Sequence, residues 1–198
     1  ERARENARLA VGGDSLQADA CVGDVHRTGR IERNRVTDPY ALGLSMDSRR
    51  SQIVNLADGD LAPEGWAGLV KPALEAPEDI VLYELHVRDF GVNDPGVPAA
   101  ERGTFAAFSR PGSLGMTHLH GLAEAGLSHV HLLPAFDCAT IPENPADRRA
   151  PPDLSGFGAD SERQQAEVGK VRARDAFNWC YDPYHYTVPE GSYSTDPD

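Results

Sequence analysis

The sequence predicts an α/β fold, because a strand, a helix and a second strand follow one another in its second half. Residues 80–90, IVLYELHVRDF, indicate a strand that is apolar on both faces at its start and polar toward its end. Such a pattern is typical of a buried parallel strand, whose carboxyl end faces the active site in α/β folds. A second strand, SHVHLLP at 128–134, is expected to end at Pro134, so this strand–helix–strand unit predicts a right-handed parallel crossover.

The helix between these strands is expected in the stretch after Gly112 and ends before Gly126. Leu119, Leu122 and Ala123 repeat at helical spacing. Gly126 lies where a left-handed C-cap is needed, and Leu127 follows as its hydrophobic contact.

The first part of the chain has a different composition. Residues 36–45 and 50–56 indicate short strands or extended segments. Residues 58–79 contain three Pro and three Gly, which is a linker composition. We therefore expect a domain boundary near Asp79.

The segment 137–175 is long, polar and rich in proline. Only 161–172 has helical character, with Ser161 and Gln164 as a capping box. A loop of this length within a compact domain is usually functional or disordered.

The last stretch, 177–198, holds five of the twelve Phe and Tyr residues together with three Pro. We expect an irregular segment, too rich in proline for a helix or a central strand. Within it, Asn178, Trp179, Tyr181 and Asp182 combine aromatic rings with short polar groups, as sugar sites do. The alternative is a loop whose rings pack down on the core.

Charge and cysteine content exclude some classes of function. The net charge of −12 argues against a duplex nucleic-acid partner, and no run of eighteen apolar residues indicates a membrane span. Three widely spaced cysteines, Cys21, Cys138 and Cys180, predict free thiols rather than a disulfide framework or a zinc site. The chain begins with Glu and no leader pattern follows, so we expect a fragment or a processed form whose compartment is open.

Histidines raise a second possibility. His129 and His131 lie two residues apart on one strand face, which is a metal-ligand geometry, so a metallohydrolase is considered beside ordinary half-buried histidines. His86, Arg88 and Asp89 are compatible with either a catalytic role or an ion-pair network.

Several motifs together resemble type I pullulanases, the debranching α-1,6-glucosidases of the α-amylase superfamily that include limit dextrinases. The motifs are YELHVRDF, GMTHLHGLAEAGLSHVHLLPAFD and ADSERQQAEVGKVRARDAFNWCYDPYHYTVPEGSYSTDPD. Upstream of them stand RTGRIERNRVTDPYALGLSMDSRRSQIVNL and LAPEGW. The resemblance covers about residues 24–198.

The resemblance implies a partial (β/α)₈ TIM barrel preceded by a β-sandwich module. It assigns 1–57 to the remnant of the carbohydrate-binding-type module, 58–78 to a linker and 79–198 to the first part of the catalytic barrel. Residues 80–87 and 129–133 would be barrel strands one and two.

The resemblance also implies a sugar site. The Tyr of the family's NWGYDP motif stacks on the sugar at the cleavage site, and that role falls on Tyr181. Asp182 would help to hold the loop, while Asn178 and Trp179 would line or support the same floor. Cys180 replaces the usual Gly, and a positive φ there would strain it by roughly 1 kcal/mol.

The implied activity is retaining hydrolysis of α-1,6 branch linkages in pullulan, glycogen or starch dextrins, with an α-glucan as partner and no nucleic acid or membrane. The family's three catalytic carboxylates lie on later strands, so this chain is expected to contain none and to be inactive alone. The alternative is a non-catalytic α-glucan-binding relic. No cofactor is expected, and calcium use stays open.

Overall fold

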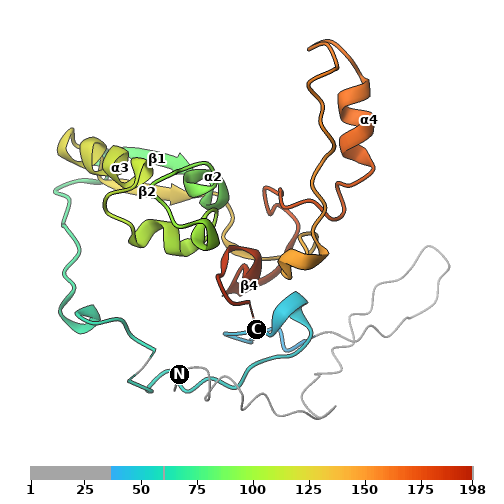
Figure 1. Cartoon of the computed structure of the whole chain (residues 1–198). Helices are drawn as coiled ribbons and strands as arrows, with labels where there is room; N and C mark the ends of the chain where they lie inside the picture. The colour runs from blue at the N-terminus through green and yellow to red at the C-terminus, as the bar shows by residue number, and fades with distance from the viewer. Residues whose placement is uncertain (1–36, 60, 198) are drawn as a thin grey trace. The chain divides into compact units, whose positions relative to one another are not determined.

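The computed structural model describes residues 37–59 and 61–197, which divide into two compact units between Lys71 and Pro72 (Figure 1). In the first unit, the strands predicted at 36–45 and 50–56 reduce to one antiparallel bridge between Leu44 and Ser51. Val36 and the segment before it lie outside the described residues, so the module predicted for 1–57 is described only from Thr37. The boundaries predicted at 57/58 and 78/79 stay predictions.

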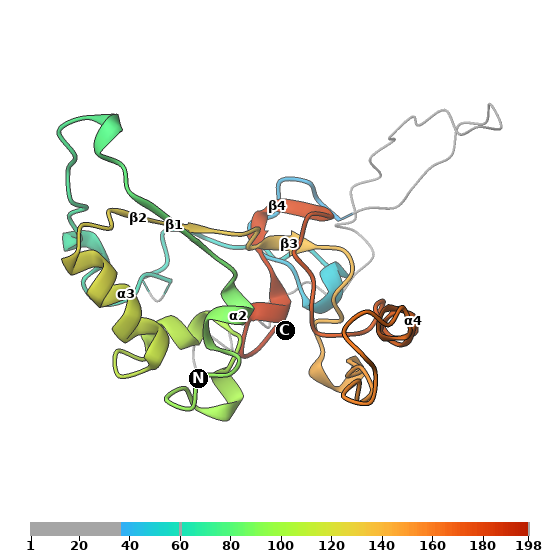
Figure 2. The same ribbon diagram turned by 90° about the horizontal axis from the view of Figure 1, so that it is seen from above.

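The second unit begins with the predicted strand–helix–strand arrangement. Strands β1 (Leu82–Leu85) and β2 (His129–Leu132) pair in parallel, with Leu82 opposite His129. Helix α3 (Leu114–Glu124) connects them along the chain and lies beside the pair in both views (Figures 1 and 2). The prediction of an α/β unit with a parallel strand pair is confirmed.

Helix α3 ends as its sequence predicts. Gly126 has a φ of 106°, in the region that side chains other than glycine avoid. Its N–H donates to the carbonyl of Ala123, and the N–H of Leu127 donates to the carbonyl of Leu122. These two bonds form a Schellman motif, which satisfies carbonyls that the helix end would otherwise leave unpaired.

The first strand is shorter than predicted, and 80–90 is not one strand. His86 ends β1 and caps the short helix α2 (Val87–Gly91), because its Nδ1 accepts the backbone N–H of Asp89 at 3.4 Å. Arg88 and Asp89 therefore lie on a helical turn. The backbone changes from strand to helix at His86 because its side chain caps the first turn of α2.

The proline-rich end of the chain also differs from the prediction. Strand β4 (Pro183–Pro189) pairs antiparallel with β3 (Phe136–Cys138), with irregular register. The prediction of an irregular tail is therefore wrong for this part. Pro183 and Pro189 stand at the two ends of the strand, where a missing N–H does least damage to a two-stranded ladder.

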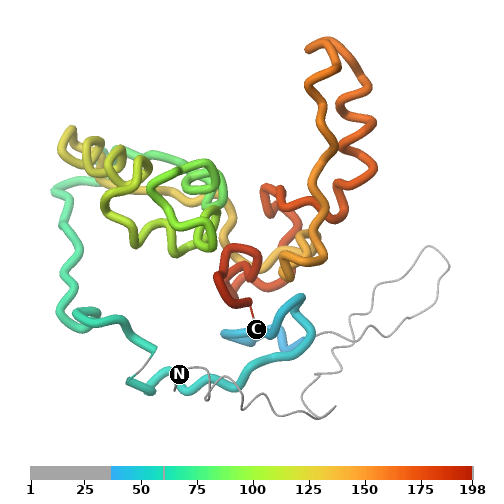
Figure 3. Tube along the Cα trace, viewed as in Figure 1, coloured from blue at the N-terminus to red at the C-terminus, as the bar shows by residue number. Residues whose placement is uncertain are grey.

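The chain between these strands runs out through α4 (Arg163–Gly169) and back (Figure 3). The N–H of Arg149 donates to the carbonyl of Arg174 at 2.7 Å and joins the two arms. The predicted capping box does not form, since the Gln164 amide donates to the carbonyls of Phe157 and Gly158 instead.

Short 3-10 helices occupy other connections: Met46–Ser48, Trp66–Gly68, Pro77–Asp79, Ala99–Glu101, Phe105–Ser109, Pro145–Asp147 and Gly191–Tyr193. Among the described residues, no helix has the length and apolar character needed to cross a membrane.

The buried apolar cluster draws on α2, on β3 and on segments outside the strands, and contains Val87, Cys138, Ile141, Cys180 and Tyr193. Strands β1 and β2 are less covered: Leu82 is 54% exposed, and Val81, Val130 and Leu132 are also exposed. The core therefore supports the start of α2 and the end of the chain more than it supports the parallel pair.

Candidate functional site

The aromatic loop 177–182, between α4 and β4, is held by one asparagine. The Asn178 amide Nδ2 donates to Asp182 Oδ1 at 3.0 Å and to Thr140 Oγ1, and Thr140 Oγ1 donates to Asp182 Oδ2 at 2.6 Å. Asn178 Oδ1 accepts the backbone N–H of Cys180 at 3.0 Å. Asn178 and Asp182, the two polar residues of the predicted sugar site, thus close the loop on itself.

Cys180 ties the same loop to β3. It is fully buried and joined to Cys138 by a disulfide, with the two Cα atoms 5.3 Å apart. The prediction of free thiols is therefore wrong for these two, because segments 42 residues apart in sequence meet here; Cys21 lies outside the described residues. Cys180 has a φ of 54°, so the positive φ that a glycine would favour is present.

His86 and Tyr193 support the loop from beneath. The Asp89 N–H donates to Nδ1 of His86, so Nε2 carries the proton and donates to the carbonyl of Asn178 at 2.9 Å. Tyr193 Oη lies 3.1 Å from the same Nε2 and 3.6 Å from Cys180 Sγ. Because a disulfide sulfur has no proton, the hydroxyl is the donor to it. Burial, chiefly, raises the pKa of Tyr193, which keeps it protonated as that donor.

The rings on the loop divide into supported and open ones. Phe177 and Trp179 pack near His86, with centroids 5.8 and 6.4 Å from its ring, and Arg88 lies over the Phe177 ring. Tyr181 is 68% exposed and contacts no other ring among the described residues. An open aromatic face on a fixed backbone is suited to stacking against an apolar ring face.

A buried polar cluster is formed by one residue of β3 and two residues outside the strands. The Asp137, Glu143 and Glu190 side chains offer carboxylate oxygens within 4.8 Å of one another. Asp137 meets His185 Nδ1 at 3.0 Å across the β3–β4 pair. An oxygen-only set of this kind suits a hard cation such as calcium.

Glu190 connects this cluster to β3. Its carboxylate accepts the N–H groups of Cys138 and Ser192, at 2.7 and 2.9 Å. Burial raises its pKa, against the lowering effect of these hydrogen bonds, and the nearby Asp137 adds to the rise. The buried Glu190 carboxyl therefore links the segment after β4 to β3.

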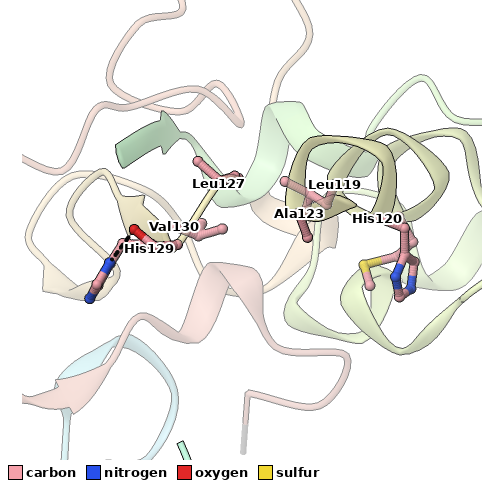
Figure 4. Close-up of a pocket in the computed structure, with 8 residues that line it drawn as sticks. Leu119, His120, Ala123, Leu127, His129 and Val130 are labelled. Atoms are coloured by element: carbon pink, nitrogen blue, oxygen red, sulfur yellow. Dashed lines mark hydrogen bonds between the residues drawn. The ribbon is translucent and has the colours of Figure 1, made fainter. Parts of the chain in front are cut away.

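An apolar pocket of about 260 Å³ lies elsewhere in the second unit, between α3 and β2 (Figure 4). Leu119 and Ala123 face it from the helix, and His129 and Val130 from the strand. His129 bonds to Ser128 Oγ at 2.9 Å, and His131 lies 3.7 Å from Glu84. Across the described part of the chain, neither histidine belongs to a group of three ligands, and both are exposed rather than half-buried.

The structure therefore brings Asn178 and Asp182 together and leaves the ring of Tyr181 open beside them. Trp179 is half exposed and packs near His86. Sequence reasoning missed the supporting residues Cys138, Thr140 and Tyr193. Their partners lie 13 to 107 positions away, so no local pattern indicates them.

Comparison with known proteins gives consistent results. The chain is 42% identical over 174 residues to pullulanase 1, chloroplastic, of Arabidopsis thaliana, which covers 86% of this chain and 18% of that protein. It is 37% identical over 207 residues to the pullulanase of Klebsiella aerogenes, covering 85% and 19%. No family model matches.

Two solved structures are similar. The maltotriose complex of PulA from Klebsiella pneumoniae gives a TM-score of 0.75 at 34% identity, over 86% of this chain and 22% of that one. The pullulanase of Paenibacillus barengoltzii, in complex with maltohexaose and alpha-cyclodextrin, gives 0.60 at 33% identity, over 84% and 22%. The chain thus spans about a fifth of the length of the relatives it matches.

Proposed function

We propose, from the premise that this chain belongs to the pullulanase family, that the whole protein hydrolyses α-1,6-glucosidic branch linkages in pullulan, glycogen or starch dextrins. The reaction would proceed with retention, which requires a carboxylate nucleophile and a carboxyl acid/base about 5–5.5 Å apart. The acid/base protonates the bridging oxygen while the nucleophile attacks the anomeric carbon.

In this proposal the second unit is the first part of a (β/α)₈ barrel. Strands β1 and β2 are its first two strands and α3 its first helix, while the segment up to residue 57 is the end of a β-sandwich module. The parallel pairing of β1 with β2 supports this, as does the exposure of Leu82 and Val130, since strands inside a closed barrel are buried on both faces.

Within that frame, we assign Tyr181 as the ring that stacks on a glucosyl unit next to the cut. The observation that carries this assignment is an open tyrosine ring on a backbone fixed on both sides, by Asn178 with Asp182 and by the Cys138–Cys180 disulfide. Asn178 and Asp182 act by holding the loop, and Trp179 extends the apolar surface beside Tyr181.

Affinity electrophoresis in gels that contain glycogen tests the assignment. Tyr181→Ala should weaken the retardation of the chain by about tenfold in affinity, as expected for one lost aromatic contact. Tyr186→Ala is the matched control, because Tyr186 is an exposed tyrosine of β4 whose ring packs on Phe136. Equal losses from the two variants would contradict a specific role for Tyr181.

We also propose that the chain alone is inactive, since the catalytic carboxylates of the family belong to later strands. Glu84 and Asp89, at the end of β1 and on α2, are not assigned to their roles. Release of maltotriose from pullulan by the purified chain would refute this. A second candidate function is α-glucan binding without turnover, because an exposed aromatic ring on the loop suits a binding protein as well as an enzyme. Retardation of the chain in glycogen gels without product release supports this function only if the longer protein is also inactive.

A further inference from the structure

A second pocket of the same unit has chemistry that a neutral sugar does not require. It measures about 300 Å³, at the lower end of the roughly 300–1,000 Å³ typical of small-molecule sites. Three arginines line it, Arg88, Arg102 and Arg148, together with Thr104 and Thr195, and none of the lining residues is acidic. Three cations around one cavity are unusual in a chain of net charge −12.

The arginines keep donors available. Arg102 uses its Nε on the carbonyl of Val97, and among the described residues its two Nη atoms have no acceptor. Arg148 is fixed by its Nε and Nη2, which donate to the carbonyls of Pro142 and Glu143 at 2.7 and 2.9 Å, and its Nη1 bonds to nothing in the described part of the chain.

The charges around Arg148 act in both directions. Burial lowers the pKa of Arg148; Arg88 lowers it further, while the nearby Glu190 and Glu143 oppose the change. Arg88 itself is paired with the exposed Asp89, at 3.0 Å. An anion between the guanidinium groups would relieve the repulsion between Arg88 and Arg148 and accept the unused donors.

We propose that this cavity is a binding site for a small molecule that carries a phosphate group, held by Arg88, Arg102 and Arg148 with the hydroxyls of Thr104 and Thr195. A phosphate has three acceptor oxygens that match forked guanidinium donors, which a neutral glucan lacks. Tyr193 lines the same cavity and bonds to His86 and Cys180, so the phosphate site shares a wall with the support of the Tyr181 loop.

Isothermal titration calorimetry of the whole chain tests this site, at an ionic strength held constant with chloride. The chain is titrated separately with inorganic phosphate, glucose 6-phosphate and glucose. Saturable binding of both phosphates and none of glucose is expected. Arg102→Gln should weaken phosphate binding by about tenfold or more, the loss expected for charge-assisted hydrogen bonds. Ala100→Glu adds a carboxylate to the exposed wall and should abolish binding without removing any hydrogen bond.

Arg163→Gln is the matched control, since it removes the same charge from exposed α4, outside the cavity. It should leave phosphate affinity unchanged. An equal loss in Arg163→Gln and Arg102→Gln would overturn the proposal, as would the absence of saturable phosphate binding. So would unchanged affinity in Ala100→Glu with circular dichroism like that of the parent chain. None of these readings depends on glucan binding or turnover, so the phosphate site can fail while the proposed function stands.

Discussion

The second unit contains two pairs of strands, and they differ in the contacts that stabilise them. The parallel β1–β2 pair leaves apolar side chains such as Leu82 and Val130 exposed, and one helix lies beside it. The antiparallel β3–β4 pair is tied by the Asp137–His185 contact, by Glu190 and by the Cys138–Cys180 disulfide. The apolar side chains of the β1–β2 pair are left uncovered, whereas the β3–β4 pair is held by contacts between residues in or next to its own two strands. The loop that carries Tyr181 belongs to the self-contained pair.

Reduction of the disulfide should break this contrast most strongly. A closed loop of 42 residues contributes up to about 4 kcal/mol by restricting the unfolded chain. Addition of dithiothreitol transfers two electrons and two protons to the sulfurs, and should increase hydrogen exchange in β3 and β4 while α3 changes little. Hydrogen exchange followed by mass spectrometry measures both regions in one sample.

A thiol count provides the control for that experiment. Under denaturing, non-reducing conditions the chain should show one reactive thiol, Cys21, rather than three. Three reactive thiols, or equal loss of protection in α3 and β4 on reduction, would contradict the difference between the two pairs.

Tyr193→Phe should have the next largest effect. The ring stays, but the hydroxyl contacts to His86 and Cys180 are lost inside a region where Tyr193 is 1% exposed, so about 1–2 kcal/mol of unfolding free energy should disappear. Urea unfolding followed by tryptophan fluorescence measures the change. Tyr186→Phe, which alters an exposed hydroxyl, should change stability by less than about 0.5 kcal/mol; a similar loss from both would show that the buried contacts are not what matters.

Sequence predicted the parallel pair better than the self-contained one, for a physical reason. The helix end at Gly126 and the strand at β2 follow from neighbouring residues, so a local pattern is enough. His86 as the cap of α2, and the disulfide, depend on partners or competing bonds that periodicity does not encode. The motif at 178–182 was enough to predict the residues of the sugar site. The residues that hold this motif in place, such as Cys138 and Thr140, are distant in sequence and were not predicted. The assignment of Tyr181 itself stays a prediction.

Glu190 predicts a pH dependence of stability that arises at the β3–β4 pair. Its folded pKa is raised above the ordinary 4.5, chiefly by burial, so the folded state binds the proton more tightly than the unfolded state. Its contribution to stability is thus full below the unfolded value and is lost as pH rises through the folded pKa, by at most about 1.4 kcal/mol per pH unit. Glu190→Gln should flatten this slope in thermal melts taken across that range, while Glu162→Gln at the exposed start of α4 should leave it intact. A wild-type stability that rises over the same range after subtraction of the Glu190→Gln profile would contradict the raised pKa.

The smallest expected effect concerns Cys180, which both forms the disulfide and adopts a positive φ. Substitutions at this position separate these two roles. Cys180→Gly and Cys180→Ala both remove the disulfide, but at a φ of 54° only glycine is unstrained. The Gly variant should therefore be more stable than the Ala variant by about 1 kcal/mol, the reverse of the usual order of these residues. The comparison is made by urea unfolding of both variants with reductant present. Gly126→Ala, at a φ of 106° in the Schellman motif of α3, should cost a comparable amount. If Cys180→Ala proved the more stable, the loop would have relaxed to a negative φ once the disulfide was gone, and the disulfide rather than the surrounding hydrogen bonds of Asn178 would be what imposes the conformation presented by Tyr181.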